Sequence, residues 1–132
     1  MKQPEPASPR LGILFQGMGA VTSTLIAGVL AVRRGLGQPF GSLSQMGRFN
    51  GSAGSLIKNR VDLTPLDGLV FGGWDIFGGD MVDACETANV LQFSLLAELA
   101  EELRQIKPMP GAFDPRYVRR LNGTCIKSGT RR

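Results

Sequence analysis

The sequence predicts an α/β fold, in which part of a doubly wound parallel sheet is flanked by helices. Two short apolar runs, residues 11–15 and 66–71, each end at two close glycines, as buried parallel strands do. Each run is followed by a segment with the spacing of a helix. The 132 residues, of which 42% are hydrophobic and eighteen are glycine, fit one globular domain rich in tight turns.

The first half of the chain is predicted to form strand, helix and strand. Residues 11–15 are apolar throughout except for one glycine, and residues 20–34 follow with apolar side chains at helical spacing. Two glycines just beyond this segment are expected to end the helix. Residues 40–46 can form a second short strand. Residues 47–59 are rich in Gly, Asn, Ser and Ala and are expected to be a loop.

The second half is predicted to begin with a strand over residues 66–71, which ends on two glycines. Asp80 is expected to cap a helix that runs to about Ala88, because a carboxylate accepts hydrogen bonds from the first amides of a helix.

Residues 94–106 carry an apolar stripe opposed by charged residues and predict an amphipathic packing helix. The stripe consists of Leu95, Leu99, Leu103 and Ile106. Pro108 and Pro110 exclude a helix over residues 107–114. We expect a helix fragment and a tail beyond them.

The two glycines after the first strand suit a phosphate, because such a turn aims backbone amides and a helix dipole at one point. Gly17 permits the tight turn, and Gly19 lets the backbone approach a pyrophosphate closely. Thr22 replaces the third glycine of the GxGxxG pattern, so the pattern alone is weak evidence. The hydroxyls of Thr22, Ser23 and Thr24 either donate to phosphate oxygens or cap the helix start.

A second glycine-containing loop, FGGWDIF, lies at the end of the strand predicted over residues 66–71. Ligands of open parallel sheets gather beyond the carboxyl ends of the strands, so both loops are expected to face one pocket. Asp75 is the one acid in these loops, and its carboxylate either accepts hydrogen bonds from ribose hydroxyls or caps a turn. The usual ribose acid is missing, because residues 36–61 contain neither Asp nor Glu.

Candidates for acid–base chemistry are few. The chain has no histidine, and no cleft loop holds a pair of carboxylates, so a lysine or another chain would have to supply the proton transfers. Lys58 and Lys127 are the candidates, although both read more simply as surface residues. Cys85 and Cys125 have no neighbouring Cys or His, so we expect neither a metal site nor a redox motif, in a reduced cytoplasmic setting.

The formal net charge of +4 comes mostly from the C-terminal residues. A solvated or partner-facing tail is favoured over a nucleic-acid surface, because Tyr117 is the one aromatic residue there. The first ten residues have no apolar signal core, and the most apolar stretch, residues 25–32, is too short to span a bilayer. We expect no nucleic-acid partner and no membrane partner.

Five segments in this order resemble the inositol-3-phosphate synthases, also called myo-inositol-1-phosphate synthases, of the bacterial and archaeal type. They are GMGAVTSTLIAGVLAVRRGL, GSLSQMG, TPLDGLVFGGWDIF, IKPMPGAFD and YVRRLNGT. The resemblance implies an NAD-dependent isomerase of inositol and phospholipid biosynthesis that converts D-glucose 6-phosphate to 1D-myo-inositol 3-phosphate by oxidation, aldol cyclisation and reduction. It also implies a homo-oligomer. The residues implied to line the pyrophosphate are Gly17, Gly19, Ala20, Val21 and Thr22, and Asp75 is implied to contact the nucleotide.

Residues 1–10, with three prolines and scattered charges, are expected to be a flexible lead. The resemblance covers residues 11–129, which are expected to form a partial NAD-binding Rossmann-like domain, and residues 130–132 are a basic tail. Members of the family are much longer, and their catalytic lysines lie in a later domain. No catalytic residue can therefore be assigned, and we expect a truncated or partial copy that is inactive alone. A truncated non-enzymatic NAD-binding or interaction module is the alternative. A different Rossmann-type dehydrogenase is disfavoured by the missing ribose acid.

Overall fold

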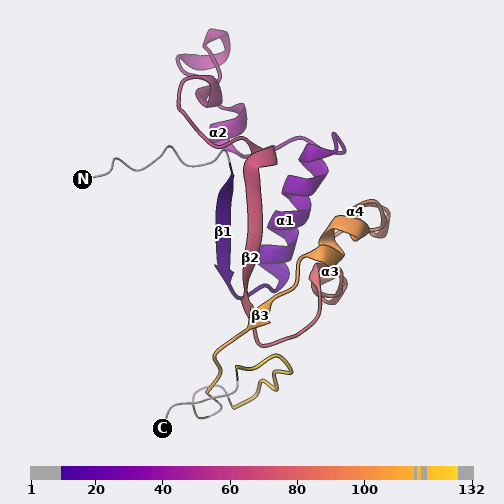
Figure 1. Ribbon diagram of the computed structural model, residues 1–132. Helices are drawn as coiled ribbons and strands as arrows, with labels where there is room; N and C mark the ends of the chain where they lie inside the picture. Colours follow the sequence, from indigo (N-terminus) through magenta and orange to yellow (C-terminus); the bar gives the residue numbers. More distant parts are fainter. Residues whose placement is uncertain (1–9, 115, 117–118, 128–132) are drawn as a thin grey trace, which may run out of the picture.

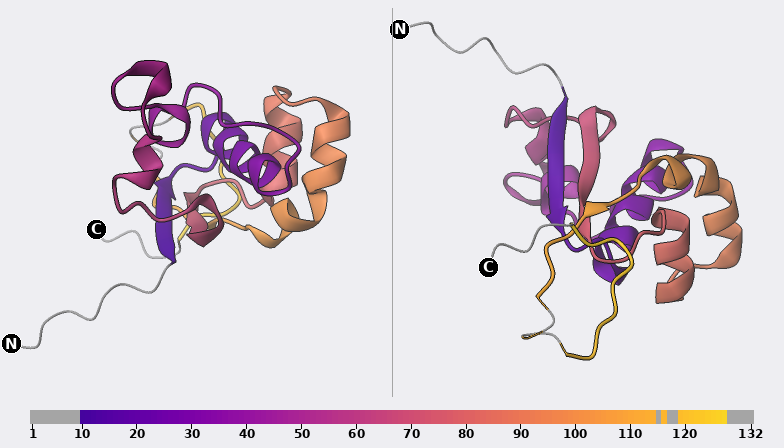
Figure 2. Two further views of the ribbon diagram at one scale, coloured as in Figure 1. Left: turned by 90° about the horizontal axis from the view of Figure 1, so that it is seen from above. Right: turned by 60° about the horizontal axis from the view of Figure 1, so that its bottom comes forward.

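The protein is described by a computed structural model, which covers residues 10–114, 116 and 119–127. In this part of the chain a three-stranded sheet has the order β1-β2-β3, and both pairings are parallel. Three helices, α1, α3 and α4, pack together on one face of the sheet (Figures 1 and 2). The predicted α/β fold with a parallel sheet and flanking helices is therefore confirmed. The predicted lead lies outside the described residues except for Arg10, and so does the predicted tail, residues 130–132.

The first strand and helix match the prediction. Strand β1 spans Leu11–Gln16, and helix α1 spans Ala20–Arg33. The turn between them occupies three residues. The amino end of α1 therefore lies directly beyond the carboxyl end of β1.

The strand predicted over residues 40–46 is wrong. Gly41 has φ of +81°, which turns the chain, and a short helix, α2 (Leu43–Met46), follows. The Met46 N–H donates to the Ser42 carbonyl at 3.0 Å. The predicted loop over residues 47–59 holds two 3₁₀ turns, Gly51–Ala53 and Ile57–Asn59. Together these elements form an excursion that projects beyond one end of the sheet (Figure 1).

Strand β2 spans Leu69–Asp75, so the strand predicted over residues 66–71 is displaced at both ends. Leu66–Gly68 is a 3₁₀ turn, and the two glycines lie inside the strand. A Cβ on Gly73 would lie 2.3 Å from the carbonyl oxygen of Phe15 on β1. Gly73 is therefore required for the close approach of β1 and β2, and it does not end the strand.

The two later helices match their predictions closely. Helix α3 spans Met81–Ala88, and Asp80 caps it as predicted. Asp83 in turn accepts a hydrogen bond from the Asp80 N–H and so completes a capping box. Helix α4 spans Phe93–Gln105. Its predicted stripe is confirmed at Leu99 and Leu103, which are fully buried, and Leu96 joins them.

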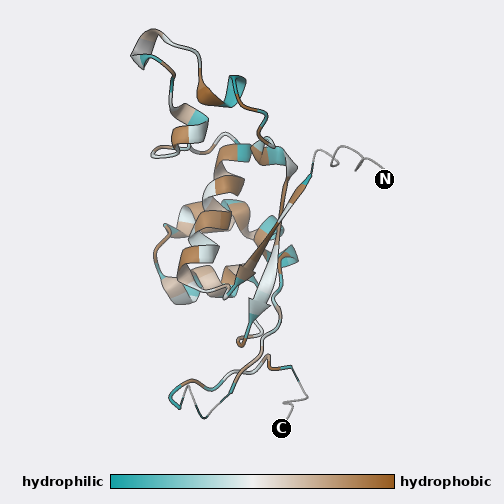
Figure 3. Cartoon of the chain, turned by 90° about the vertical axis from the view of Figure 1, so that its left-hand side faces the viewer, coloured by the Kyte–Doolittle hydropathy of each residue, from teal (hydrophilic) through white to brown (hydrophobic). Residues whose placement is uncertain are grey.

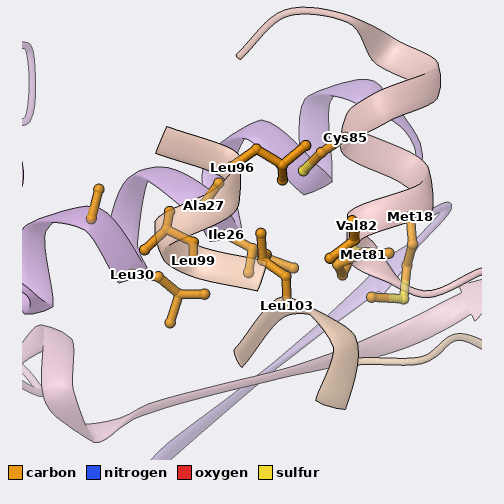
Figure 4. Packing of buried hydrophobic residues seen from close by; sticks show 11 residues of the cluster. Met18, Ile26, Ala27, Leu30, Met81, Val82, Cys85, Leu96, Leu99 and Leu103 are labelled. Carbon is orange, nitrogen blue, oxygen red and sulfur yellow. The ribbon is translucent and has the colours of Figure 1, made fainter. Parts of the chain in front are cut away.

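The hydrophobic core fills the space between α1, α3 and α4 and reaches the glycine turn (Figure 4). Its buried residues are Met18, Ile26, Ala27, Leu30, Ala31, Met81, Val82, Cys85, Leu96, Leu99 and Leu103. Because Met18 belongs to this core, the turn that carries the candidate site is anchored to the helical layer.

The end of the described chain is extended. Strand β3 spans Met109–Pro110, and Gly111 forms a parallel bridge with Ile126. The prediction that residues 107–114 are not helical is confirmed. The described residues beyond them contain no helix fragment, and residues 115 and 117–118 lie outside the description. Among the helices described here, none combines the length and the apolar character that crossing a membrane requires.

Candidate nucleotide-binding site

The turn between β1 and α1 is held by backbone hydrogen bonds and by one unusual dihedral angle. The Gly17 N–H donates to the Trp74 carbonyl at 2.9 Å, which extends the sheet by one residue. Gly17 has φ of +96°, a conformation that side chains rarely adopt. The structure therefore confirms that this turn requires glycine at position 17.

Gly19 is explained neither by its backbone nor by packing. Its φ is −80°, which any residue can adopt, and a Cβ at this position would meet no atom of the described residues within 4 Å apart from its chain neighbours. Gly19 occupies the N-cap position of α1, and as a glycine it offers no side chain to cap the helix. The open space beside it is what a ligand lying against the backbone would need.

The amino end of α1 presents unpaired amides. The Ser23 N–H donates to the Gly19 carbonyl at 2.9 Å, so the N–H groups of Ala20, Val21 and Thr22 precede the first hydrogen bond of the helix. The first turn of α1 contains no acidic residue. These amides and the positive end of the helix dipole can therefore stabilise an anion.

The three hydroxyls of this helix start donate inward. The Thr22 hydroxyl donates to the Gly17 carbonyl at 2.9 Å, and the Ser23 and Thr24 hydroxyls donate to the Ala20 carbonyl at 3.1 Å and 2.7 Å. None of the three hydroxyls caps the helix start, and none directs its proton away from the helix, so neither predicted role of these hydroxyls is seen. A contact between any of these residues and a phosphate stays a prediction.

The carboxylate of Asp75 joins the two loops. One oxygen accepts from the Met18 N–H at 2.6 Å and the other from the Phe77 N–H at 2.9 Å. Of the two roles open to Asp75, the turn-capping role is therefore observed. Each carboxylate oxygen keeps a second lone pair, so contact with a ribose stays a prediction.

Two cavities open at the carboxyl ends of the strands, and Asp75 lines both. The first, about 540 Å³, lies between the glycine turn, the loop after β2 and the start of α3. Its lining residues are Met18, Gly19, Ala20, Asp75, Phe77, Gly78, Gly79, Asp80, Met81, Asp83, Ala84, Thr87, Ala88, Pro108 and Thr124. The second, about 640 Å³, is lined by Gln16, Gly17, Trp74, Asp75, Ile76, Pro110, Gly111, Ala112 and Lys127.

The two loops singled out in the sequence are thus brought together. Sequence reasoning missed Gly78 and Gly79, although they directly follow the predicted FGGWDIF loop, which ends at Phe77. It also missed Thr124, which reaches the first cavity from a distant part of the sequence. Of the two candidate lysines, Lys127 lines the second cavity and Lys58 lines neither.

Comparison with known proteins points in one direction. The NAD-binding domain model described as myo-inositol-1-phosphate synthase matches residues 11–132. Inositol-3-phosphate synthase 1 of Bacteroides thetaiotaomicron is 47% identical over 136 residues, which cover 100% of this chain and 32% of that protein. Isozyme 1 of Arabidopsis thaliana is 35% identical over 88% of this chain and 26% of that protein. The chain thus spans about a third of the length of these relatives or less.

A solved structure supports the fold. The crystal structure of inositol-3-phosphate synthase from Caenorhabditis elegans superposes with a TM-score of 0.74 at 21% sequence identity. The match covers 92% of this chain and 28% of that one. The Rossmann-type arrangement is therefore shared with that protein.

Proposed function

Because this chain belongs to the myo-inositol-1-phosphate synthase family, we propose that its glycine turn holds the pyrophosphate of NAD at the amino end of α1. The chain carries the NAD-binding domain of the family and corresponds to the N-terminal part of its members. The open space beside the Gly19 backbone supports this placement, since no described residue other than its chain neighbours comes within 4 Å of the position of a Cβ there.

The pyrophosphate would accept hydrogen bonds from the amides of Ala20, Val21 and Thr22. Gly17 would shape the turn, and Gly19 would leave room for the phosphate oxygens. These donors lie at the positive end of the α1 dipole, which favours a dianionic group. The proposed contacts with the pyrophosphate are therefore made by backbone N–H groups of this chain and by no side chain.

The two nucleoside halves of NAD would occupy the two cavities on either side of this turn. Each cavity has the volume typical of small-molecule sites. Asp75 lines both, so a ribose hydroxyl in either cavity could donate to its carboxylate. Trp74 lines the second cavity and offers an aromatic surface there.

The activity of the complete synthase is proposed for a longer protein that contains this domain. NAD, when bound, would accept a hydride from glucose 6-phosphate and return it after ring closure to inositol 3-phosphate. This chain would bind and orient the cofactor, and the catalytic groups would come from outside the described residues. A homo-oligomer in the cytoplasm belongs to the same proposal, and the free thiols of Cys85 and Cys125 suit that compartment.

Binding of NAD can be tested by the fluorescence of Trp74, the single tryptophan of the chain. Titration with NAD is expected to give a saturable change. Gly19→Val should abolish it, because the new side chain would fill the space proposed for the pyrophosphate. Gly28→Val is the matched control, since a Cβ on Gly28 also meets no atom within 4 Å but lies away from both cavities.

Equal binding by Gly19→Val and Gly28→Val would exclude the proposed pyrophosphate position. The absence of any response in the folded wild-type chain would remove the proposed function itself. Far-UV circular dichroism of each variant establishes that the chain is folded.

Enzymatic and non-enzymatic roles are separated by complementation. The chain alone should not convert glucose 6-phosphate. When it is co-expressed with the part of the Bacteroides thetaiotaomicron synthase that it does not span, activity is expected to appear. A mixture that binds NAD and stays inactive, although the two parts copurify, would favour the non-enzymatic NAD-binding module.

A further inference from the structure

Residues 123–127, which we call the strap, return from a distant part of the sequence to the carboxyl end of β2. The Cys125 N–H donates to the Ile76 carbonyl at 2.7 Å, and the Gly111 N–H donates to the Cys125 carbonyl at 3.1 Å. The Lys127 N–H in turn donates to the Gly111 carbonyl at 3.0 Å. The strap is therefore bonded both to the loop after β2 and to the segment after β3.

The strap fits closely against the loop after β2. A Cβ on Gly123 would lie 2.7 Å from the Ile76 carbonyl oxygen, so the backbones touch at that point. A Cβ on Gly78 would lie 3.3 Å from the Cβ of Cys125. Glycine is thus needed at position 123, and the space beside Gly78 is tight, so the strap fits closely against this loop.

The strap also reaches both cavities. Thr124 lines the first cavity, and Lys127 lines the second. The Thr124 hydroxyl oxygen accepts from the Gly78 N–H at 3.3 Å. No described residue accepts the proton of this hydroxyl, so the proton is available to a group in the first cavity.

We propose that Thr124 is a nucleotide-binding residue, which donates its hydroxyl proton to a ribose or phosphate oxygen while its oxygen positions the loop at Gly78. This inference rests on the proposed function, because it assumes that a nucleotide occupies the first cavity. The inference extends the site to the strap, which lies outside both glycine-containing loops predicted from the sequence. The bound nucleotide would also hold the strap in place, since the Thr124 hydroxyl would contact the nucleotide and the Gly78 N–H at once.

Three variants test the role of this hydroxyl. Thr124→Val removes it without changing the size of the side chain, and it should raise the Kd for NAD about tenfold, as the loss of one hydrogen bond to a polar ligand does. Thr124→Ser should restore the wild-type value within about twofold. Thr64→Val is the matched control, because Thr64 lines neither cavity. All three are titrated by Trp74 fluorescence.

Hydrogen exchange separates ligand contact from a merely structural role. The peptide containing residues 119–127 should exchange more slowly when NAD is bound in the wild-type chain, and this protection should disappear in Thr124→Val at saturating NAD. A role limited to the Gly78 contact predicts no dependence on NAD.

Wild-type affinity in Thr124→Val, or equal exchange with and without NAD, would overturn the inference. If the wild-type chain binds NAD, either of these outcomes leaves the proposed function intact. A wild-type chain with no response to NAD would overturn both.

Discussion

The two faces of the sheet differ in how their apolar residues are covered. On the helical face, Phe15 and Phe71 lie with their ring centroids 6.3 Å apart and pack against the buried core. On the opposite face, Leu14 is 63% exposed, Val70 50% and Trp74 40%. Figure 3 shows apolar residues along the strands and helices and the layer of helices on one side.

This difference shows which part of the fold supports the site. Met18 is buried in the helical layer, and its backbone N–H is bonded to Asp75. The glycine turn is therefore anchored to the covered face, while the opposite face contributes exposed apolar area. Such area favours association with another surface.

The largest expected effect comes from the centre of the covered face. Leu103→Ala removes a fully buried side chain and should reduce the free energy of unfolding by about 2–5 kcal/mol. Leu14→Ala, on the opposite face, should change it by less than about 0.5 kcal/mol. Urea denaturation of both variants measures the contrast. Similar losses would mean that the exposed face is covered in solution.

The two adjacent glycines of β2 give a sharper test, because they face opposite sides of the sheet. A Cβ on Gly73 would lie 2.3 Å from the Phe15 carbonyl oxygen, whereas a Cβ on Gly72 would lie 3.5 Å from a methyl group of Leu14. Gly73→Ala should therefore cost about 1–3 kcal/mol of unfolding free energy. Gly72→Ala should be tolerated. An unchanged midpoint of urea denaturation for Gly73→Ala would contradict the close β1–β2 approach.

The uncovered face should lead to self-association. Sedimentation velocity of the wild-type chain is expected to show an average sedimentation coefficient that rises with protein concentration. Leu14→Lys places a charge in the centre of the exposed apolar face and should suppress this rise. Thermal unfolding at low concentration should be almost the same for both chains. A concentration-independent coefficient for the wild type would mean that this face does not associate.

The smallest effect is expected from the titration of Cys85 on the covered face. Burial raises the pKa of this thiol, the charge of Glu86 raises it further, and a hydrogen bond with Ser23 opposes the increase. The folded state therefore holds the Cys85 proton more tightly than the unfolded state does. The stability that this gives is complete below the pKa of the unfolded thiol, about 9, and is lost as the pH rises through the higher pKa of the folded thiol. Cys85→Ala should flatten the fall in stability above pH 9, as measured by urea denaturation. The same slope in both chains would contradict this.

The sequence predicted those elements in which local pattern and tertiary structure agree. Helices α3 and α4 form where their sequence pattern predicts them, and Asp80 caps α3 as expected. Helix α1 also forms where predicted, but the apolar positions that predicted it, Leu25, Val29 and Val32, are not its buried ones. Its buried apolar residues are Ile26, Ala27, Leu30 and Ala31.

The strand predicted over residues 40–46 is wrong, because the spacing of Phe40, Leu43 and Met46 carries no information about a strand partner, and the turn at Gly41 leads into α2. The glycines of β2 were mistaken for a strand end, although Gly73 serves a contact with β1 that only the pairing reveals.

The candidate site was predicted to a similar degree. The positions of Gly17, Gly19 and Asp75 at one edge follow from the rule that parallel strands end together. The inward hydrogen bonds of Thr22, Ser23 and Thr24 depend on hydroxyl orientation, which spacing does not fix. Thr124 gave no local signal at all, because its place beside Gly78 results from the long return of the chain.

The hydrogen bond between Met18 and Asp75 has a consequence for how the molecule folds. These residues are 57 positions apart, and the excursion that holds α2 lies between them. Closing so long a loop costs entropy before the strands pair, so the meeting of β1 and β2 should be a slow step. Competence to bind a nucleotide would then appear only after this pairing. Shortening the excursion should speed folding, measured by stopped-flow refolding, while the affinity for NAD stays unchanged.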